Sequence, residues 1–127
     1  MSTRSTVTRW VLRLHFVVAL VFGIPLLFFA GRAAGWVHWY ARDYTSWKVL
    51  GAALVALGVG SLLASGQPRR HRPLVVTQLT FEVLGALGIA YRLWVAKGYT
   101  PSFAVVPLIV LVAFAVLLGL FFPVGER

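Results

Sequence analysis

Four long apolar runs dominate this 127-residue chain and constrain its fold more than any other feature. They cover about residues 8–30, 47–65, 73–94 and 101–122, and little of the chain lies outside them. A bilayer core about 30 Å thick is crossed by roughly 20 apolar residues of α-helix. The chain is 60% hydrophobic and only 12% charged, which is too apolar for an ordinary soluble domain. We therefore predict an all-α fold, a four-helix transmembrane bundle that forms one integral membrane domain over residues 1–127.

The net charge of +9 reflects the flanks of these runs more than a nucleic-acid-binding face. Basic residues concentrate around the start of the first run and in the second connection, where they are Arg4, Arg9, Arg13, Arg69, Arg70 and Arg72. Cytoplasmic loops of membrane proteins carry an excess of Lys and Arg. The pattern predicts a multi-pass protein of a bacterial inner membrane with both termini cytoplasmic, and it does not favour nucleic acid as a partner.

The first connection, "GRAAGWVHWYARDYTSWK", differs in composition from the other two. It mixes aromatic and charged residues, which is typical of segments at the headgroup level of a membrane. We expect a short interfacial helix on the outer face here. Aromatic and Arg side chains are common binding anchors, and the candidates for docking a partner subunit are Trp36, Trp39, Tyr40 and Arg42.

Small residues indicate where helices approach closely, because packing in lipid relies on close backbone contact. The second run has such residues on a four-residue step, and the third run offers a comparable position. These candidate packing residues are Ala52, Ala56, Gly60, Ala64 and Gly85. We predict that the second and third spans form the tight central pair.

The third run carries polar residues within its apolar sequence, "VVTQLTFEVLG". At about 100° per residue, Gln78, Glu82 and Arg92 fall on one side of the helix, and Glu82 lies near the membrane midplane. Intramembrane carboxylates are costly and are candidate functional sites. Three states remain open for Glu82: it is protonated, it is hydrogen-bonded to Gln78 or another helix, or it pairs with a cation from another span or subunit.

The chain offers little else for chemistry. It has no cysteine, no recognisable nucleophile or phosphate-binding motif, and only three carboxylates, so neither an enzyme nor a metal site is expected. His15, just inside the first run, is a weak candidate ligand for haem or chlorophyll. His71 stands in the basic "RRHR" stretch, where a solvated loop explains it better than a second haem ligand. No cofactor is predicted.

Residues 47–94 resemble the central helical hairpin of the small four-span bacterial proteins grouped as DoxX-like. The shared features are a Gly- and Ala-rich helix from Gly51 to Ala64, a basic loop from Arg69 to Arg72, and a third helix with polar positions at Gln78 and Glu82. The fourth run, which opens with "TPSFAVVPL", fits as well. The resemblance implies a four-helix architecture and a small accessory or assembly subunit of a larger membrane complex, such as a respiratory or photosynthetic electron-transfer assembly.

An alternative function comes from a comparison with the small multidrug transporters, which are similar in length and number of spans. Those proteins exchange protons for cationic substrates through one membrane carboxylate on their first helix. Here the carboxylate, Glu82, is on the third span. A small proton-coupled transporter that uses Glu82 is therefore the second functional hypothesis. Fluoride channels of this size are disfavoured because the chain contains no asparagine.

Overall fold

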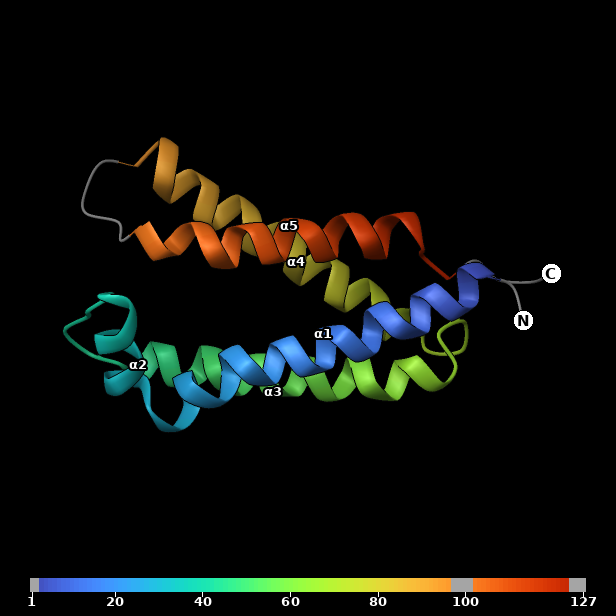
Figure 1. Ribbon diagram of the computed structural model, residues 1–127, viewed down its shortest axis with the longest axis horizontal. Coiled ribbons are helices and arrows are strands. Elements are labelled where there is room, and N and C mark those ends of the chain that lie inside the picture. Colours follow the sequence, from blue (N-terminus) through green and yellow to red (C-terminus); the bar gives the residue numbers. More distant parts are fainter. Residues whose placement is uncertain (1–2, 97–101, 124–127) are drawn as a thin grey trace.

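The computed structural model describes residues 3–96 and 102–123, and this part of the chain is almost entirely helical (Figure 1). Its elements in chain order are α1 (Thr3–Phe28), α2 (Ala30–Val37), α3 (Thr45–Gly66), α4 (Arg72–Trp94), the 3-10 turn η1 (Ser102–Ala104) and α5 (Val105–Leu120). Four of these segments, α1, α3, α4 and η1 with α5, are long and apolar enough to cross a membrane. The predicted all-α bundle of four membrane-spanning helices is confirmed, and the protein is a multi-pass membrane protein.

The ends of the first span differ most from the prediction. Helix α1 begins at Thr3 instead of near residue 8 and ends at Phe28, and α2 starts at Ala30. Phe29 leaves the helical region, with φ −132° and ψ 34°. Pro25 lies inside the last turn of α1, and the Phe29 N–H still donates to the Pro25 oxygen at 2.8 Å. The predicted start of the fourth span, Pro101, lies outside the described residues.

The first connection contains the short helix predicted there, α2, followed by a turn into α3. Helix α2 ends at Val37, and the next residue, His38, adopts the left-handed conformation with φ 55°. The carboxylate of Asp43 then accepts hydrogen bonds from the Thr45 backbone N–H (3.0 Å) and hydroxyl (2.8 Å) at the start of α3. These two hydrogen bonds, led by that from the backbone N–H, lower the pKa of Asp43.

The four spans associate as two helix pairs. Helix α1 packs along α3, and α4 packs against α5, whereas α3 and α4 contact each other much less. Figure 1 shows α4 running obliquely away from α3 after the connection that joins them. The prediction that the second and third spans form the tight central pair is therefore wrong.

Glycines explain the close packing of α1 against α3. A Cβ built on Gly51 would lie 2.5 Å from Leu27 N and 2.7 Å from Gly23 O, distances that real Cβ atoms do not adopt. About two turns further along α3, a Cβ on Gly58 would lie 3.1 Å from the Ala19 Cβ. The two backbones approach here because no side chain separates them. Gly51 and Gly58 thus form the seam, on a different face of α3 from the predicted row.

The predicted row of small residues changes environment along α3. Ala52 and Ala56 are exposed, Gly60 is half-buried, and Ala64 is fully buried. A Cβ on Gly60 would lie 3.3 Å from Gln78 Nε2, so this end of the row does face α4. The row loses contact towards Ala52 because α4 diverges. The fifth predicted packing residue, Gly85, faces Leu111 of α5, at 3.1 Å from a built Cβ.

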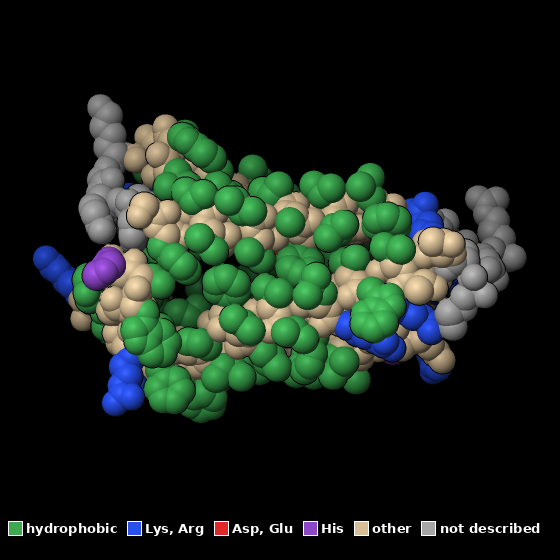
Figure 2. Space-filling model, viewed as in Figure 1, with side chains coloured by type: hydrophobic (Ala, Val, Ile, Leu, Met, Phe, Trp, Pro, Cys, Tyr) green, Lys and Arg blue, Asp and Glu red, His purple; other side chains and the backbone are tan. Residues whose placement is uncertain are grey.

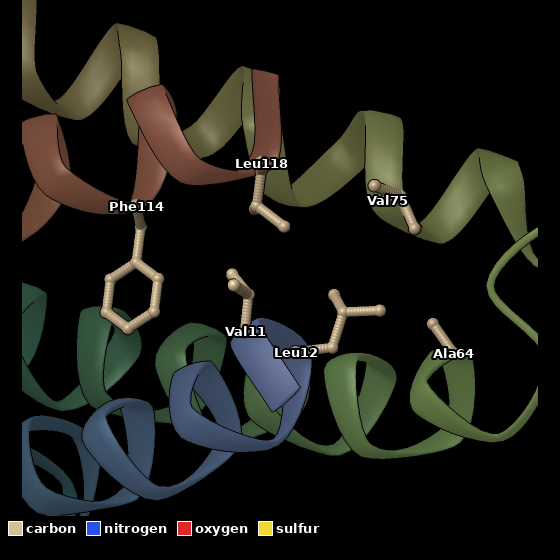
Figure 3. Close-up of a cluster of buried hydrophobic side chains, with 6 residues drawn as sticks. All are labelled: Val11, Leu12, Ala64, Val75, Phe114 and Leu118. Carbon is tan, nitrogen blue, oxygen red and sulfur yellow. The ribbon is translucent and has the colours of Figure 1, made fainter. Parts of the chain in front are cut away.

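A small apolar core joins the two helix pairs near the end where α1 begins and α5 ends. Figure 3 shows its side chains converging from α1, α3, α4 and α5. They are Val11, Leu12, Ala64, Val75, Phe114 and Leu118, all of them buried. This core is the apolar border of the polar site described next, because Phe114 belongs to both.

Candidate functional site: a buried polar cluster between helices

His15 of α1 is the centre of a polar cluster buried between the helices. Its Nδ1 lies 2.7 Å from Ser61 Oγ of α3, and its Nε2 contacts Glu82 Oε1 of α4. The exposed fractions of the three residues are 4% for His15, 0% for Ser61 and 1% for Glu82. One imidazole therefore bridges both helix pairs through two hydrogen bonds.

Each of the three helices brings its polar residue inward on an ordinary helical repeat. The buried positions of α1 recur every three or four residues, and so do those of α3 and α4 around the cluster. They are Thr8, Val11, Leu12, His15, Ala19 and Gly23 on α1, Gly58, Ser61 and Ser65 on α3, and Val75, Gln78 and Glu82 on α4. His15 is thus part of the same face that packs against the glycines of α3.

Gln78 forms a second contact between α3 and α4, one turn from Glu82. Its Nε2 donates a hydrogen bond to the backbone oxygen of Leu57, at 2.5 Å. Gln78 is 1% exposed, and its amide passes close to Gly60, which leaves room for it. Its donor group is directed to the α3 backbone, and the partner of Glu82 is His15.

The fourth helix closes the cluster with an aromatic ring. Phe114 of α5 is buried, and its ring lies edge-on to the His15 imidazole, with 4.9 Å between centroids and 80° between planes. The ring excludes water from one side of the imidazole. In such a medium of low polarity, hydrogen bonds are electrostatically stronger and unpaired polar groups are more costly.

The cluster can accommodate a proton in two arrangements. With a neutral imidazole, Nε2–H donates to Glu82 and the Ser61 hydroxyl donates to Nδ1. With an imidazolium, both ring N–H groups donate, and the Ser61 oxygen accepts. The buried oxygens Gln78 Oε1 and Glu82 Oε2 have no hydrogen-bond partner among the described residues. A His–Glu pair with a hydroxyl beside it is therefore a group that can bind and release a proton without loss of these contacts.

The order Ser61, His15, Glu82 is also that of a hydrolytic triad, in which a carboxylate orients a base that activates a hydroxyl. We predicted no nucleophile near Glu82, and Ser61 lies just across the imidazole from it. Ser61 is fully buried, however, and it does not line the open groove between α3 and α4, to which α3 contributes Leu57. A substrate carbonyl cannot reach Ser61 in this conformation, so the arrangement does not support hydrolysis.

Two further predictions concern Arg92 as part of the polar site and His15 as a ligand for haem or chlorophyll. Arg92 is exposed near the end of α4 and does not join the cluster of Gln78 and Glu82. Both ring nitrogens of His15 contact protein side chains, so ligation of haem or chlorophyll would require one contact to be given up. In residues 3–96 and 102–123 no three His, Cys, Asp or Glu side chains group together as metal ligands.

The predicted docking residues lie at the opposite end of the bundle from the apolar core. Trp36, Tyr40 and Arg42 are exposed there. Trp39 is half-buried and packs edge-on against Trp47 at the start of α3, with 5.8 Å between centroids. Trp39 thus anchors the first connection to α3, and Trp36 and Tyr40 remain available at the surface.

The sequence identified His15, Gln78 and Glu82 as candidate residues but did not predict that His15 and Glu82 contact each other. Glu82 and Gln78 stood out because polar residues are rare in a span, and His15 was considered only as a cofactor ligand. Thr77 and Thr80, the other hydroxyls of α4 near Glu82, donate to carbonyls of their own helix, those of Pro73 and Val76. The signal that could have linked His15 to Glu82 is depth, since His15 lies 12 residues after the start of α1 at Thr3 and Glu82 lies 10 residues after the start of α4 at Arg72, at the same end of the bundle.

Comparison of the chain with models of known protein families, with curated proteins and with solved structures gives no match.

Proposed function

We propose that this protein is a small accessory or assembly subunit that docks onto a larger membrane complex. The observation that supports this best is the groove where α4 diverges from α3. It is open, holds about 590 Å³, and is lined by Leu57 of α3 and by α4 residues that include Thr80 and Leu84. Next to it, Ala53 and Ala56 are exposed on α3. Small residues beside an open groove suit the close approach of a transmembrane helix.

The exposed aromatic residues at one end support the same function. Trp36 and Tyr40 lie in the connection that leads into α3, and Ala52 and Ala56 follow within the next three turns. A partner that placed a helix in the groove would meet these rings at the membrane surface. The resemblance to DoxX-like proteins also supports an accessory role. Some proteins of that group are small subunits found beside oxidoreductases.

The groove is tested by placing a large side chain at its edge, on the exposed residue that precedes Leu57. We expect Ala56→Trp to release a protein that co-purifies with the native chain in mild detergent, because the ring fills the path of the partner helix. The matched control is Val17→Trp, at an exposed position on α1. Loss of the co-purifying protein in both variants, or its retention in Ala56→Trp, would contradict docking at the groove.

The buried pair favours a second candidate, a small proton-coupled transporter that uses Glu82. His15 and Glu82 lie between two helix pairs that contact each other sparsely, so a change of proton occupancy could alter how the pairs fit together. In this case Glu82→Gln would abolish proton-dependent uptake of substrate into proteoliposomes, because Gln does not ionise. We expect instead that Glu82→Gln is nearly silent and that Glu82→Ala loosens the bundle or its association with a partner.

We propose an inner-membrane orientation with both ends of the chain cytoplasmic. The basic residues at the start of α1 and in the connection after α3 lie at one end of the bundle, which the positive-inside rule places in the cytoplasm. A reporter fused after Arg127 should then behave as cytoplasmic, and one inserted near Arg42 as exported. The reverse pattern would overturn this orientation.

A further inference from the structure

The end of the bundle where α1 begins and α5 ends, here called the basic end, carries cationic side chains that are not part of the apolar core or the polar cluster. Figure 2 shows Lys and Arg side chains at both ends of the bundle, and one group of them lies at the end where α1 begins and α5 ends. They come from α1, from the connection before α4, and from the first turn of α4, and they are Arg4, Arg9, Arg13, Arg69, Arg70 and Arg72. In residues 3–96 and 102–123 the carboxylates are Asp43, at the opposite end, and the buried Glu82.

Two of these arginines, Arg4 and Arg72, donate hydrogen bonds to backbone carbonyls that follow α5. Arg4 donates to the Phe122 oxygen at 3.2 Å, and Arg72 donates through Nε to the Pro123 oxygen at 2.8 Å. Both therefore satisfy carbonyls that follow the end of α5. These contacts neutralise no charge, so the positive potential of the basic end persists.

Arg9 and Arg13 lie one turn apart on α1, and their surroundings differ from those of Arg4 and Arg72. The Arg9 Nε is buried without a hydrogen-bond partner among the described residues. The Arg13 guanidinium is exposed and lies over the ring of Trp10, 5.2 Å from the ring centroid. Trp10 is itself exposed. Arg9 is half-buried, whereas Trp10 and Arg13 beside it are exposed, so two cations and an indole lie close together on one side of α1.

The length of α1 places these groups at the membrane surface. Its 26 residues span about 39 Å at about 1.5 Å per residue, which exceeds a hydrocarbon core of about 30 Å. The excess leaves roughly the first two turns at headgroup level, with Arg13 able to extend its side chain to the same level. Trp is enriched at this depth, and Arg matches the geometry of phosphate oxygens.

We propose that Arg9, Trp10 and Arg13 form a binding site for the headgroup of an anionic phospholipid. The phosphate oxygens accept hydrogen bonds from the two guanidinium groups, and the acyl chains run down the apolar outer face of α1 past Leu14 and Val17, both of which are exposed. A lipid fits this site better than a soluble anion, because the cations and the apolar face are continuous along one helix.

The test measures phospholipid binding to the full-length protein in a neutral detergent, by native mass spectrometry and by the shift of thermal unfolding. We expect phosphatidylglycerol to be retained and to stabilise the protein, and phosphatidylcholine to have little effect. The double variant Arg9→Gln with Arg13→Gln should bind phosphatidylglycerol about 30-fold more weakly. The matched control, Arg32→Gln with Lys48→Gln at the opposite end, should bind as the native chain does.

Two results would overturn the proposal. One is that phosphatidylcholine binds as tightly as phosphatidylglycerol, and the other is that the Arg9 and Arg13 double variant binds phosphatidylglycerol as tightly as the native chain does. Stabilisation by inorganic pyrophosphate as strong as that by the lipid would mean a site for free anions and would also overturn it. Should the double variant not fold, salt provides the second measurement on the native chain. Added sodium chloride should weaken phosphatidylglycerol binding and leave phosphatidylcholine unchanged, and an absent salt effect contradicts the proposal.

Discussion

Helix α3 is joined to α1 and to α4 in two physically different ways. Along α1 the contact is between backbones, with Gly51 set against Gly23 and Gly58 against Ala19. Against α4 the contact is limited to the end near their connection, where Gln78 donates to the Leu57 oxygen beside Gly60. One interface is a long, close seam, and the other is a short contact with hydrogen bonds that opens into a groove.

The difference shows what each kind of residue provides within a lipid bilayer. Lipid tails are as apolar as Leu, so burial of apolar side chains gives little drive for helix association there. Glycine permits dense packing over several turns, which produces the α1–α3 seam. Hydrogen bonds through His15, Glu82 and Gln78 need only one point of contact, so α4 can be fixed to α1 and α3 while the rest of it diverges.

The largest effect should follow from filling the seam. Gly51→Leu places side-chain atoms where even a Cβ would lie 2.5 Å from the backbone of Leu27, so we expect the folded protein to be lost. The matched control is Gly119→Leu, because a Cβ there meets nothing within 4 Å. Accumulation in membranes and thermal unfolding in detergent measure both variants. Comparable behaviour of the two would show that α1 and α3 do not pack closely at Gly51.

Removal of one member of the buried pair should have the next largest effect. His15→Phe or Glu82→Met leaves its partner buried without its hydrogen bond, and we expect a loss of about 3 kcal/mol of unfolding free energy. The double variant His15→Phe with Glu82→Met should lose less than either single variant, because no unpaired group remains. Additive losses in this double-mutant cycle, measured by unfolding in detergent, would mean that the two residues do not interact.

A smaller effect should follow at the contact between α3 and α4. Gly60→Ala puts a methyl group 3.3 Å from Gln78 Nε2, so Gln78 must shift, and we expect a loss of about 1 kcal/mol. Gly88→Ala, on the open surface of α4, should be neutral or slightly stabilising because Ala favours a helix over Gly. Were Gly60→Ala to stabilise the protein as Gly88→Ala does, Gln78 would not be held tightly against α3.

The smallest effect concerns Asp43, outside both interfaces. Its pKa is lowered in the folded protein, chiefly by the Thr45 backbone N–H, so its contribution to stability is complete above the ordinary pKa of 3.8. That contribution is lost as the pH falls through the lowered folded pKa. We expect Asp43→Asn to reduce the loss of stability on acidification, measured as the difference between native and variant thermal unfolding. An identical acid response in both proteins would contradict this role.

Much of the fold follows from local sequence. The apolar runs and the aromatic composition of the first connection predicted the four spans and the short helix α2, because these features depend on length and on neighbouring residues. The ends were less accurate: α1 starts at Thr3, since its polar first turns contain no residue that stops a helix. Of the candidate site, Glu82 and Gln78 were identified because polar residues in a span are conspicuous.

Partner choice between the helices did not follow from sequence. Ala52 and Ala56 have the same small side chains as a packed row, yet they face outward because α4 diverges. The sequence by itself determined that helices cross the membrane and that one of them carries a carboxylate, since both depend on residue type and spacing. Only the tertiary structure decided that His15 and Ser61 meet Glu82, because that contact depends on the relative depth, rotation and crossing of three separate helices.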